Sequence, residues 1–114
     1  MKVIPYLHDF VGELPDAIQA DIEAASSVRC YAKGEAVYRK DDQPAEVYRL
    51  LEGAVELCNY SLHGAEIIAG EFRPGDCFGE MGVIDGLPRV GNAIASRDSR
   101  IRVIKKQQFE SLYD

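Results

Sequence analysis

The stretch FGEMGVIDGLPRVG, residues 78–91, differs from the rest of the chain because it gathers four of the 10 glycines around an acid and a Pro-Arg pair. Glu80 stands among apolar residues and glycines, and Arg89 directly follows Pro88. Glycine lets the backbone approach a ligand closely. A short helical turn that began near Gly79 would also present free N–H groups to an anion. The composition therefore predicts a ligand-binding interruption between strands, with an anion as one part of the ligand.

The two charged side chains suit different groups of one ligand. Arg89 carries a permanent charge on a planar fork that can donate two hydrogen bonds to a phosphate. Glu80, when ionised, only accepts hydrogen bonds and would repel a phosphate, so it requires a hydroxyl. The other acid, Asp85, precedes Gly86 and is interpreted as a turn residue. A ligand with a phosphate beside a ribose hydroxyl satisfies Glu80 and Arg89 together, and a cyclic nucleotide is such a ligand.

Short strands are expected on both sides of this stretch. Three apolar residues alternate with Arg29 and Tyr31, namely Val28, Cys30 and Ala32. This period of two predicts a half-buried strand whose buried side carries these apolar residues. Further strands are expected at residues 36–39, 46–51, 54–61, 66–69, 92–96 and 99–104.

Turn residues separate these strands, as in Glu52-Gly53 and the run RPGD at 73–76. Tyrosines recur along the strands and are expected to pack across them with their hydroxyls outward: Tyr31, Tyr38, Tyr48 and Tyr60. Many short strands at this spacing favour a closed β-sandwich or roll.

Apart from the short turn near Gly79, helices are expected at the two ends of the chain. Apolar residues recur at helical spacing in one early segment, at Leu14, Ile18, Ile22 and Ala25. A shorter helical piece containing Leu7 and Phe10 is expected before it. Residues 107–113 resemble the first turns of another helix, with Phe109 and Leu112 on one side.

Size, charge and cysteine content limit the function classes. With 114 residues, of which 46% are hydrophobic, the chain can build one packed core but not two. The net charge of -6 argues against a nucleic-acid-binding surface, which needs clustered Lys and Arg. No apolar run reaches the roughly 18 residues of a membrane span, and the start MKVIP lacks a signal peptide's apolar segment, so a cytoplasmic location is expected. Cys30, Cys58 and Cys77 are odd in number and widely spaced, so we expect reduced thiols.

The run FGEMGVIDGLPRV resembles the phosphate-binding cassette of the cyclic nucleotide-binding domain family. Two other segments match as well: RPGDCFGE leads into the cassette, and LLEGAVEL resembles the family's earlier strand-Gly-strand turn. This family includes catabolite-activator-type bacterial regulators, regulatory subunits of cyclic-nucleotide-dependent kinases, and nucleotide-gated channels. The resemblance covers nearly the whole chain.

The resemblance implies a mainly β fold. Its form is a β-roll, also called a double-stranded β-helix or jelly roll, of about eight strands with flanking N-terminal helices and the start of a C-terminal helix. The chain then divides into an N-terminal helical segment (1–27), the roll with its cassette at 78–91 (28–106), and the start of the C-terminal helix (107–114).

The resemblance also implies roles for particular residues. Glu80 would accept a hydrogen bond from the ribose 2′-hydroxyl, and Arg89 would bind the cyclic phosphate. The remaining polar contacts would come from the backbone of Gly79, Met81, Gly82 and Val90. The family usually has Ala, Ser or Thr after the cassette arginine, and a hydroxyl there accompanies cGMP preference. Val90 has no hydroxyl, so cAMP is favoured over cGMP.

The predicted function is that of a regulatory sensor domain that binds a cyclic nucleotide, with cAMP favoured, and relays the signal to an effector outside this chain. No catalytic residue, metal or further cofactor is expected, and the domain is not predicted to be an enzyme. The expected partners are the nucleotide and either a second copy or an effector domain or protein, without direct contact to nucleic acid or membrane.

Three alternatives stay open at the level of sequence. The roll could be a ligand-free interaction or dimerisation module of a catabolite-activator-like regulator. Glu80 and Arg89 could form an exposed ion pair worth about 0 to 1 kcal/mol. A cupin-like metal enzyme would use His63 and Glu66, but 2 His in the whole chain are too few for such a site.

Overall fold

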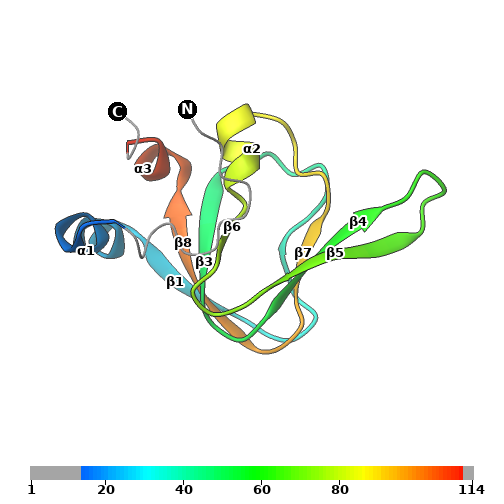
Figure 1. Ribbon diagram of the computed structural model, residues 1–114, viewed down its shortest axis with the longest axis horizontal. Coiled ribbons are helices and arrows are strands. Elements are labelled where there is room, and N and C mark those ends of the chain that lie inside the picture. Colours follow the sequence, from blue (N-terminus) through cyan, green and yellow to red (C-terminus); the bar gives the residue numbers. More distant parts are fainter. Residues whose placement is uncertain (1–13, 112–114) are drawn as a thin grey trace.

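A computed structural model describes residues 14–111, which form eight strands and three helices (Figure 1). In chain order, the elements are α1 (Asp16–Ala25), β1 (Ser27–Tyr31), β2 (Ala36–Tyr38), β3 (Glu46–Glu52), β4 (Val55–Tyr60), β5 (Glu66–Phe72), β6 (Cys77–Phe78), α2 (Glu80–Asp85), β7 (Asn92–Ala95), β8 (Ser99–Lys105) and α3 (Lys106–Ser111). No helix in this part of the chain is long and apolar enough to cross a membrane.

The strands form two four-stranded sheets, ordered β1-β8-β3-β6 and β2-β7-β4-β5. All six pairs are antiparallel, and four of them form a nested series: β1 pairs with β8, β2 with β7, β3 with β6, and β4 with β5. This nesting is the pattern of a long hairpin wound into a roll. The mainly β jelly-roll fold predicted from the sequence is thereby confirmed.

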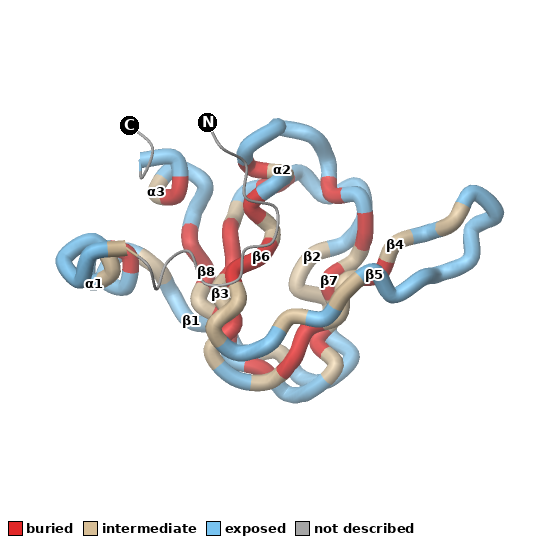
Figure 2. Tube along the Cα trace, in the orientation of Figure 1, coloured by how far each residue is buried: buried red, intermediate tan, exposed pale blue. Residues whose placement is uncertain are grey.

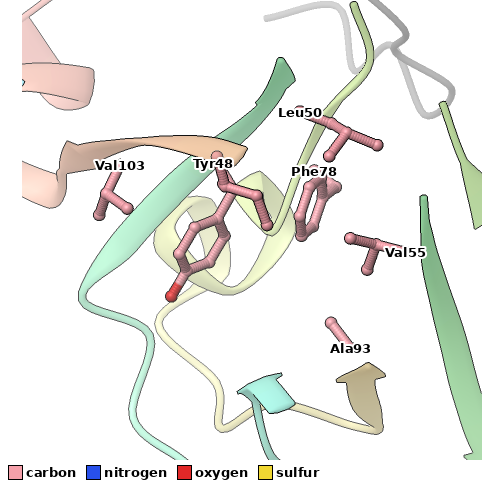
Figure 3. Packing of buried hydrophobic residues seen from close by; sticks show 7 residues of the cluster. Tyr48, Leu50, Val55, Phe78, Ala93 and Val103 are labelled. Carbon is pink, nitrogen blue, oxygen red and sulfur yellow. The ribbon is translucent and has the colours of Figure 1, made fainter. Parts of the chain in front are cut away.

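The main core lies between the two sheets (Figure 3). It consists of the buried residues Tyr48, Leu50, Val55, Phe78, Ala93, Ile101 and Val103. A column of stacked aromatic rings crosses this core, with ring centroids 4.7 Å apart for Phe72 and Phe78, 5.3 Å for Phe78 and Tyr48, and 5.9 Å for Tyr48 and Tyr38. Such rings contribute a large buried area together with a defined packing geometry.

A second core lies between the first sheet and the helices. Val47 and Ile104 are register partners on β3 and β8, on the face opposite to Tyr48 and Leu50. The cluster comprises Ile22, Val47, Cys77, Val83, Ile104 and Phe109, so each of the three helices contributes one residue. The β4–β5 hairpin, by contrast, is largely exposed beyond β7 (Figure 2).

Most predicted elements form close to their expected positions. β6 was not predicted because its two residues directly follow the turn at 73–76 and directly precede the cassette. The helix expected around Leu7 and Phe10 lies outside the described residues. In α1, Ile22 is buried, but Ile18 keeps 38% of its surface exposed.

The predicted burial of β1 is wrong. Val28 and Cys30 pair with Arg102 and Arg100 and are exposed, whereas Tyr31 packs against the core between the sheets. Ala32 is also exposed. Arg29 can share the inner face because its two terminal nitrogens donate to the two carboxylate oxygens of Glu46, at 3.1 and 2.7 Å. The orientation of β1 is therefore opposite to the one that the apolar alternation predicts, and an ion pair at its edge accompanies it.

Candidate functional site

The short helix α2 begins and ends at glycines in the left-handed region. Gly79 caps its N-terminus with φ 83°, and Gly86 follows its C-terminus with φ 74°. A side chain is strained at such angles. A Cβ on Gly79 would lie 2.9 Å from Cδ2 of Tyr48, and one on Gly82 would lie 2.5 Å from Cγ of Pro44. These glycines thus let α2 pack tightly against β3 and against the loop between β2 and β3.

Arg89 is buried, with only 6% of its surface exposed. One terminal nitrogen donates to the carbonyl oxygen of Gly79, and the other donates to that of Glu46 at 2.7 Å. The guanidinium carbon lies 4.3 Å from the ring centroid of Tyr38, within cation–π range. Carbonyl dipoles and an aromatic face therefore stabilise this buried charge, and the alternative of an exposed ion pair with Glu80 is wrong.

The main chain of Arg89 is also hydrogen-bonded, at both its N–H and its carbonyl. Its N–H donates to the carbonyl of Asp42 at 2.9 Å, and its carbonyl accepts from the N–H of Asp41 at 2.7 Å. Asp41 itself has a positive φ of 74°. The loop between β2 and β3 therefore fixes both ends of the arginine.

Glu80 is the first residue of α2 and is 9% exposed. No hydrogen bond or ion pair joins its carboxylate to another residue in the described part of the chain. Burial raises its pKa above the usual value for Glu, while its own backbone N–H and the charge of Arg89 act in the opposite direction. Among the described residues, none other than Glu80 itself donates a hydrogen bond to this carboxylate.

A cavity of about 630 Å³ lies beside α2, within the size range of small-ligand sites. Its lining includes all the residues that the sequence predicted as ligand contacts: Gly79, Glu80, Met81, Gly82, Arg89 and Val90. Leu57, Phe72 and Leu87 add apolar surface. Val90 is 73% exposed, so its side chain lies at the cavity's edge rather than deep inside it.

Residues 28–114 match the family of cyclic nucleotide-binding domains. The chain belongs to this family. It is 33% identical over 94 residues to a cAMP-dependent protein kinase regulatory subunit of Mycosarcoma maydis, covering 80% of this chain and 18% of the relative. It is 26% identical over 112 residues to the cyclic AMP receptor protein of Thermus thermophilus, covering 98% of this chain and 50% of the relative.

Solved structures show the same fold. The regulatory subunit of a cAMP-independent protein kinase A from Trypanosoma brucei aligns with a TM-score of 0.85 at 22% identity, over 90% of this chain and 38% of that one. The chain thus spans half or less of each of these relatives, and it is a cyclic nucleotide-binding regulatory domain by family.

In this cyclic nucleotide-binding domain, the sequence did not reveal the residues that position Arg89. Tyr38 and Tyr48 were expected to direct their hydroxyls outward, but Tyr48 is 4% exposed and its hydroxyl donates to a carboxylate oxygen of Glu46 at 3.2 Å. Burial raises the pKa of both tyrosines. The contribution of Glu46 through its backbone carbonyl has no sequence signal, because every residue has a carbonyl.

His63 and Glu66, the residues considered for a metal enzyme, lie in the turn between β4 and β5 and at the start of β5. Within residues 14–111, no three His, Cys, Asp or Glu side chains come together in a way that could hold a metal ion.

Proposed function

We propose that this domain binds cAMP in the cavity beside α2 and relays its occupancy to an effector. The observation that carries the proposal is that a buried arginine and a buried glutamate line the same cavity, and that no other described residue donates a hydrogen bond to the glutamate. A phosphate and a neighbouring ribose hydroxyl have the matching charge and hydrogen-bonding groups.

Each group of the ligand has a partner in this arrangement. Glu80 accepts the ribose 2′-hydroxyl, and Arg89 donates to the cyclic phosphate. Backbone groups of Gly79, Met81, Gly82 and Val90 supply the remaining polar contacts. The domain performs no catalysis, and its response acts on another domain, a partner protein or a second copy.

The preference for cAMP rests on Val90, which offers no hydroxyl to the 2-amino group of guanine. The two curated relatives carry cAMP in their names, whereas the Trypanosoma kinase is described as cAMP-independent. The choice of nucleotide is therefore a property to be measured on this chain.

Arg89→Ala tests the proposal. The substitution should weaken cAMP binding by about 2 to 4 kcal/mol because a buried charge pair loses one partner. The matched control is Arg100→Ala, since Arg100 is exposed and pairs with Glu52 away from the cavity. A folded Arg89→Ala protein that binds cAMP as tightly as the parent would eliminate the phosphate contact, and the ligand-free interaction module would then be the better description.

A further inference from the structure

The guanidinium of Arg89 bridges two strands at the point where their pairing stops. β6 pairs with β3 and ends at Phe78. Beyond that end, Arg89 donates to the carbonyl of Gly79, which follows β6, and to the carbonyl of Glu46, the first residue of β3. These two acceptors are neutral, so they orient the guanidinium without cancelling its charge.

The charge of Arg89 therefore remains for a ligand. A guanidinium has five N–H donors, and the two carbonyls leave up to three of them for an anion. A carboxylate on the same donors would compete with a phosphate, because both are oxyanions that a guanidinium binds with its planar fork. The affinity of this site thus depends on how the carboxylates near Arg89 are engaged.

Glu46 carries a carboxylate that can compete in this way. Its carbonyl already accepts from Arg89, and both residues border a second, smaller cavity of about 260 Å³. Both charges also act on one hydroxyl: burial raises the pKa of Tyr48 most, Glu46 raises it further, and Arg89 lowers it. The carboxylate and the guanidinium are therefore close enough to attract each other.

Arg29 engages this carboxylate from the opposite side of the sheet. Its two terminal nitrogens donate to the two oxygens of Glu46, at 3.1 and 2.7 Å, and the hydroxyl of Tyr48 donates to one of the same oxygens at 3.2 Å. The ion pair spans β8, which lies between β1 and β3 in the sheet. A bidentate pair fixes a carboxylate and neutralises it. Arg29 thus provides the countercharge of Glu46.

We propose that Arg29 is a positioning residue for the ligand site, because it engages the carboxylate of Glu46 and so keeps the charge of Arg89 available to an anionic ligand. The inference rests on the proposed function and adds a residue to it. Arg29 is not among the described residues that line the cavity beside α2, so it acts through Glu46. Without Arg29, the unpaired carboxylate of Glu46 competes with the ligand phosphate for the guanidinium.

Calorimetric titration with cAMP tests this role. Arg29→Ala should lower the affinity by about three- to tenfold. Glu46→Gln breaks the same ion pair but leaves no competing charge, so its affinity should stay within about twofold of the parent. The double variant Arg29→Ala/Glu46→Gln should return to the same range for the same reason. Equal losses in the two single variants, or a double variant as weak as Arg29→Ala, would mean that the ion pair is merely structural and would overturn the inference.

Two further variants complete the comparison. Arg29→Lys keeps a positive charge beside Glu46, so it should retain most of the affinity although it loses the planar fork. A loss in Arg29→Lys as large as that in Arg29→Ala contradicts the role of the charge. Arg100→Ala is the matched control, because Arg100 also pairs with a carboxylate of β3, Glu52, and its side chain is 49% exposed against 47% for Arg29. This control should leave cAMP affinity unchanged.

The outcomes also distinguish this inference from the proposed function. Binding of cAMP by the parent with unchanged affinity in Arg29→Ala overturns the inference and leaves the proposed function in place. A folded parent that binds no cAMP overturns both. If Arg29→Ala does not fold, Arg29→Gln takes its place, since it removes the charge and keeps a polar side chain.

Discussion

At the scale of single residues, Glu80 and Arg89 differ in how the fold treats their charges. Arg89 has two carbonyl acceptors and an aromatic neighbour, so its buried charge is stabilised before any ligand arrives. Glu80 lies in the same cavity with no donor side chain among residues 14–111, and burial raises its pKa. The acid is therefore the member of the pair that gains most from a ligand hydroxyl.

The raised pKa of Glu80 gives a signed pH dependence. The folded form binds this proton more tightly than the unfolded form does, so the contribution of Glu80 to stability falls as the pH rises above the usual range of Glu. Glu80→Gln should therefore have a higher free energy of unfolding than the parent near pH 7 in the absence of ligand. The difference should narrow in acid. Urea denaturation of both proteins from pH 4 to 7 measures it, and a parent that is the more stable protein at pH 7 contradicts the assignment.

Selectivity between nucleotides depends on Val90. Val90→Thr adds an acceptor for the 2-amino group of guanine, and a hydrogen bond of this kind discriminates by about 1 to 2 kcal/mol. The substitution should shift the preference toward cGMP, starting from a parent that favours cAMP by less than about tenfold. Competition binding with both nucleotides measures the ratio. A parent that prefers cGMP, or a ratio that Thr leaves unchanged, would refute the role of this position.

Residue types suggested that Glu80 and Arg89 contact one ligand but left an exposed ion pair open, and the resemblance to the cyclic nucleotide-binding family supplied their roles. The residue types did not predict the environment of Arg89. Its contacts come from Gly79 in the same stretch and from Glu46 and Tyr38, which are distant from it in sequence, and two of them use only a backbone carbonyl. Such contacts follow from the fold and leave no residue-specific pattern.

At the scale of elements, α2 is a six-residue helix that depends on close packing rather than on its length. Isolated helices this short are unstable in water. Gly82 lies against Pro44 of the loop between β2 and β3, and Val83 is buried in the core beneath the helices. Packing against the rest of the domain therefore holds the helix, and with it Glu80, in place.

Gly82→Ala should destabilise the domain by about 1 to 3 kcal/mol, the usual range for overpacking, because its Cβ would meet the ring of Pro44. Gly70→Ala is the matched control, since a Cβ there has no atom within 4 Å and Gly70 has no positive φ. Adding Pro44→Ala should recover part of the loss, which a double-mutant cycle in urea would measure. Equal effects of the two glycine substitutions would refute the packing role of Gly82.

Periodicity was reliable for the presence of strands and unreliable for their orientation. The alternation in 28–32 correctly predicted β1, but its apolar residues face away from the main core, whereas Tyr31 packs against that core and Arg29 pairs with Glu46. β6 has only two residues and is defined by its pairing with β3, so no local pattern could predict it.

At the scale of the whole molecule, the nested pairing of strands places the cavity where α2 interrupts the second half of the roll. Segments from 38 to 90 line it, so the site exists only in the folded chain. A ligand of such a site must stabilise the fold, because a ligand that binds only the folded form adds RT ln(1 + [L]/Kd) to the free energy of unfolding.

Saturating cAMP should therefore raise the melting temperature by several degrees. At a concentration of about 100 times Kd, the stabilisation is about 2.7 kcal/mol, and about 1 kcal/mol shifts a domain of this size by roughly 4 °C or more. Differential scanning fluorimetry at several cAMP concentrations measures the shift. AMP, which lacks the cyclic phosphate, serves as the control and should give a smaller shift.

The most direct test of the central claim, that this domain binds a cyclic nucleotide beside α2, is isothermal titration calorimetry of the purified chain with cAMP. The arrangement of Glu80 and Arg89 predicts saturable binding of one cAMP per chain, with affinity that falls by about 2 to 4 kcal/mol in Arg89→Ala and is retained in Arg100→Ala. No saturable binding of cAMP or cGMP at millimolar concentration, by a chain shown to be folded, would contradict the claim.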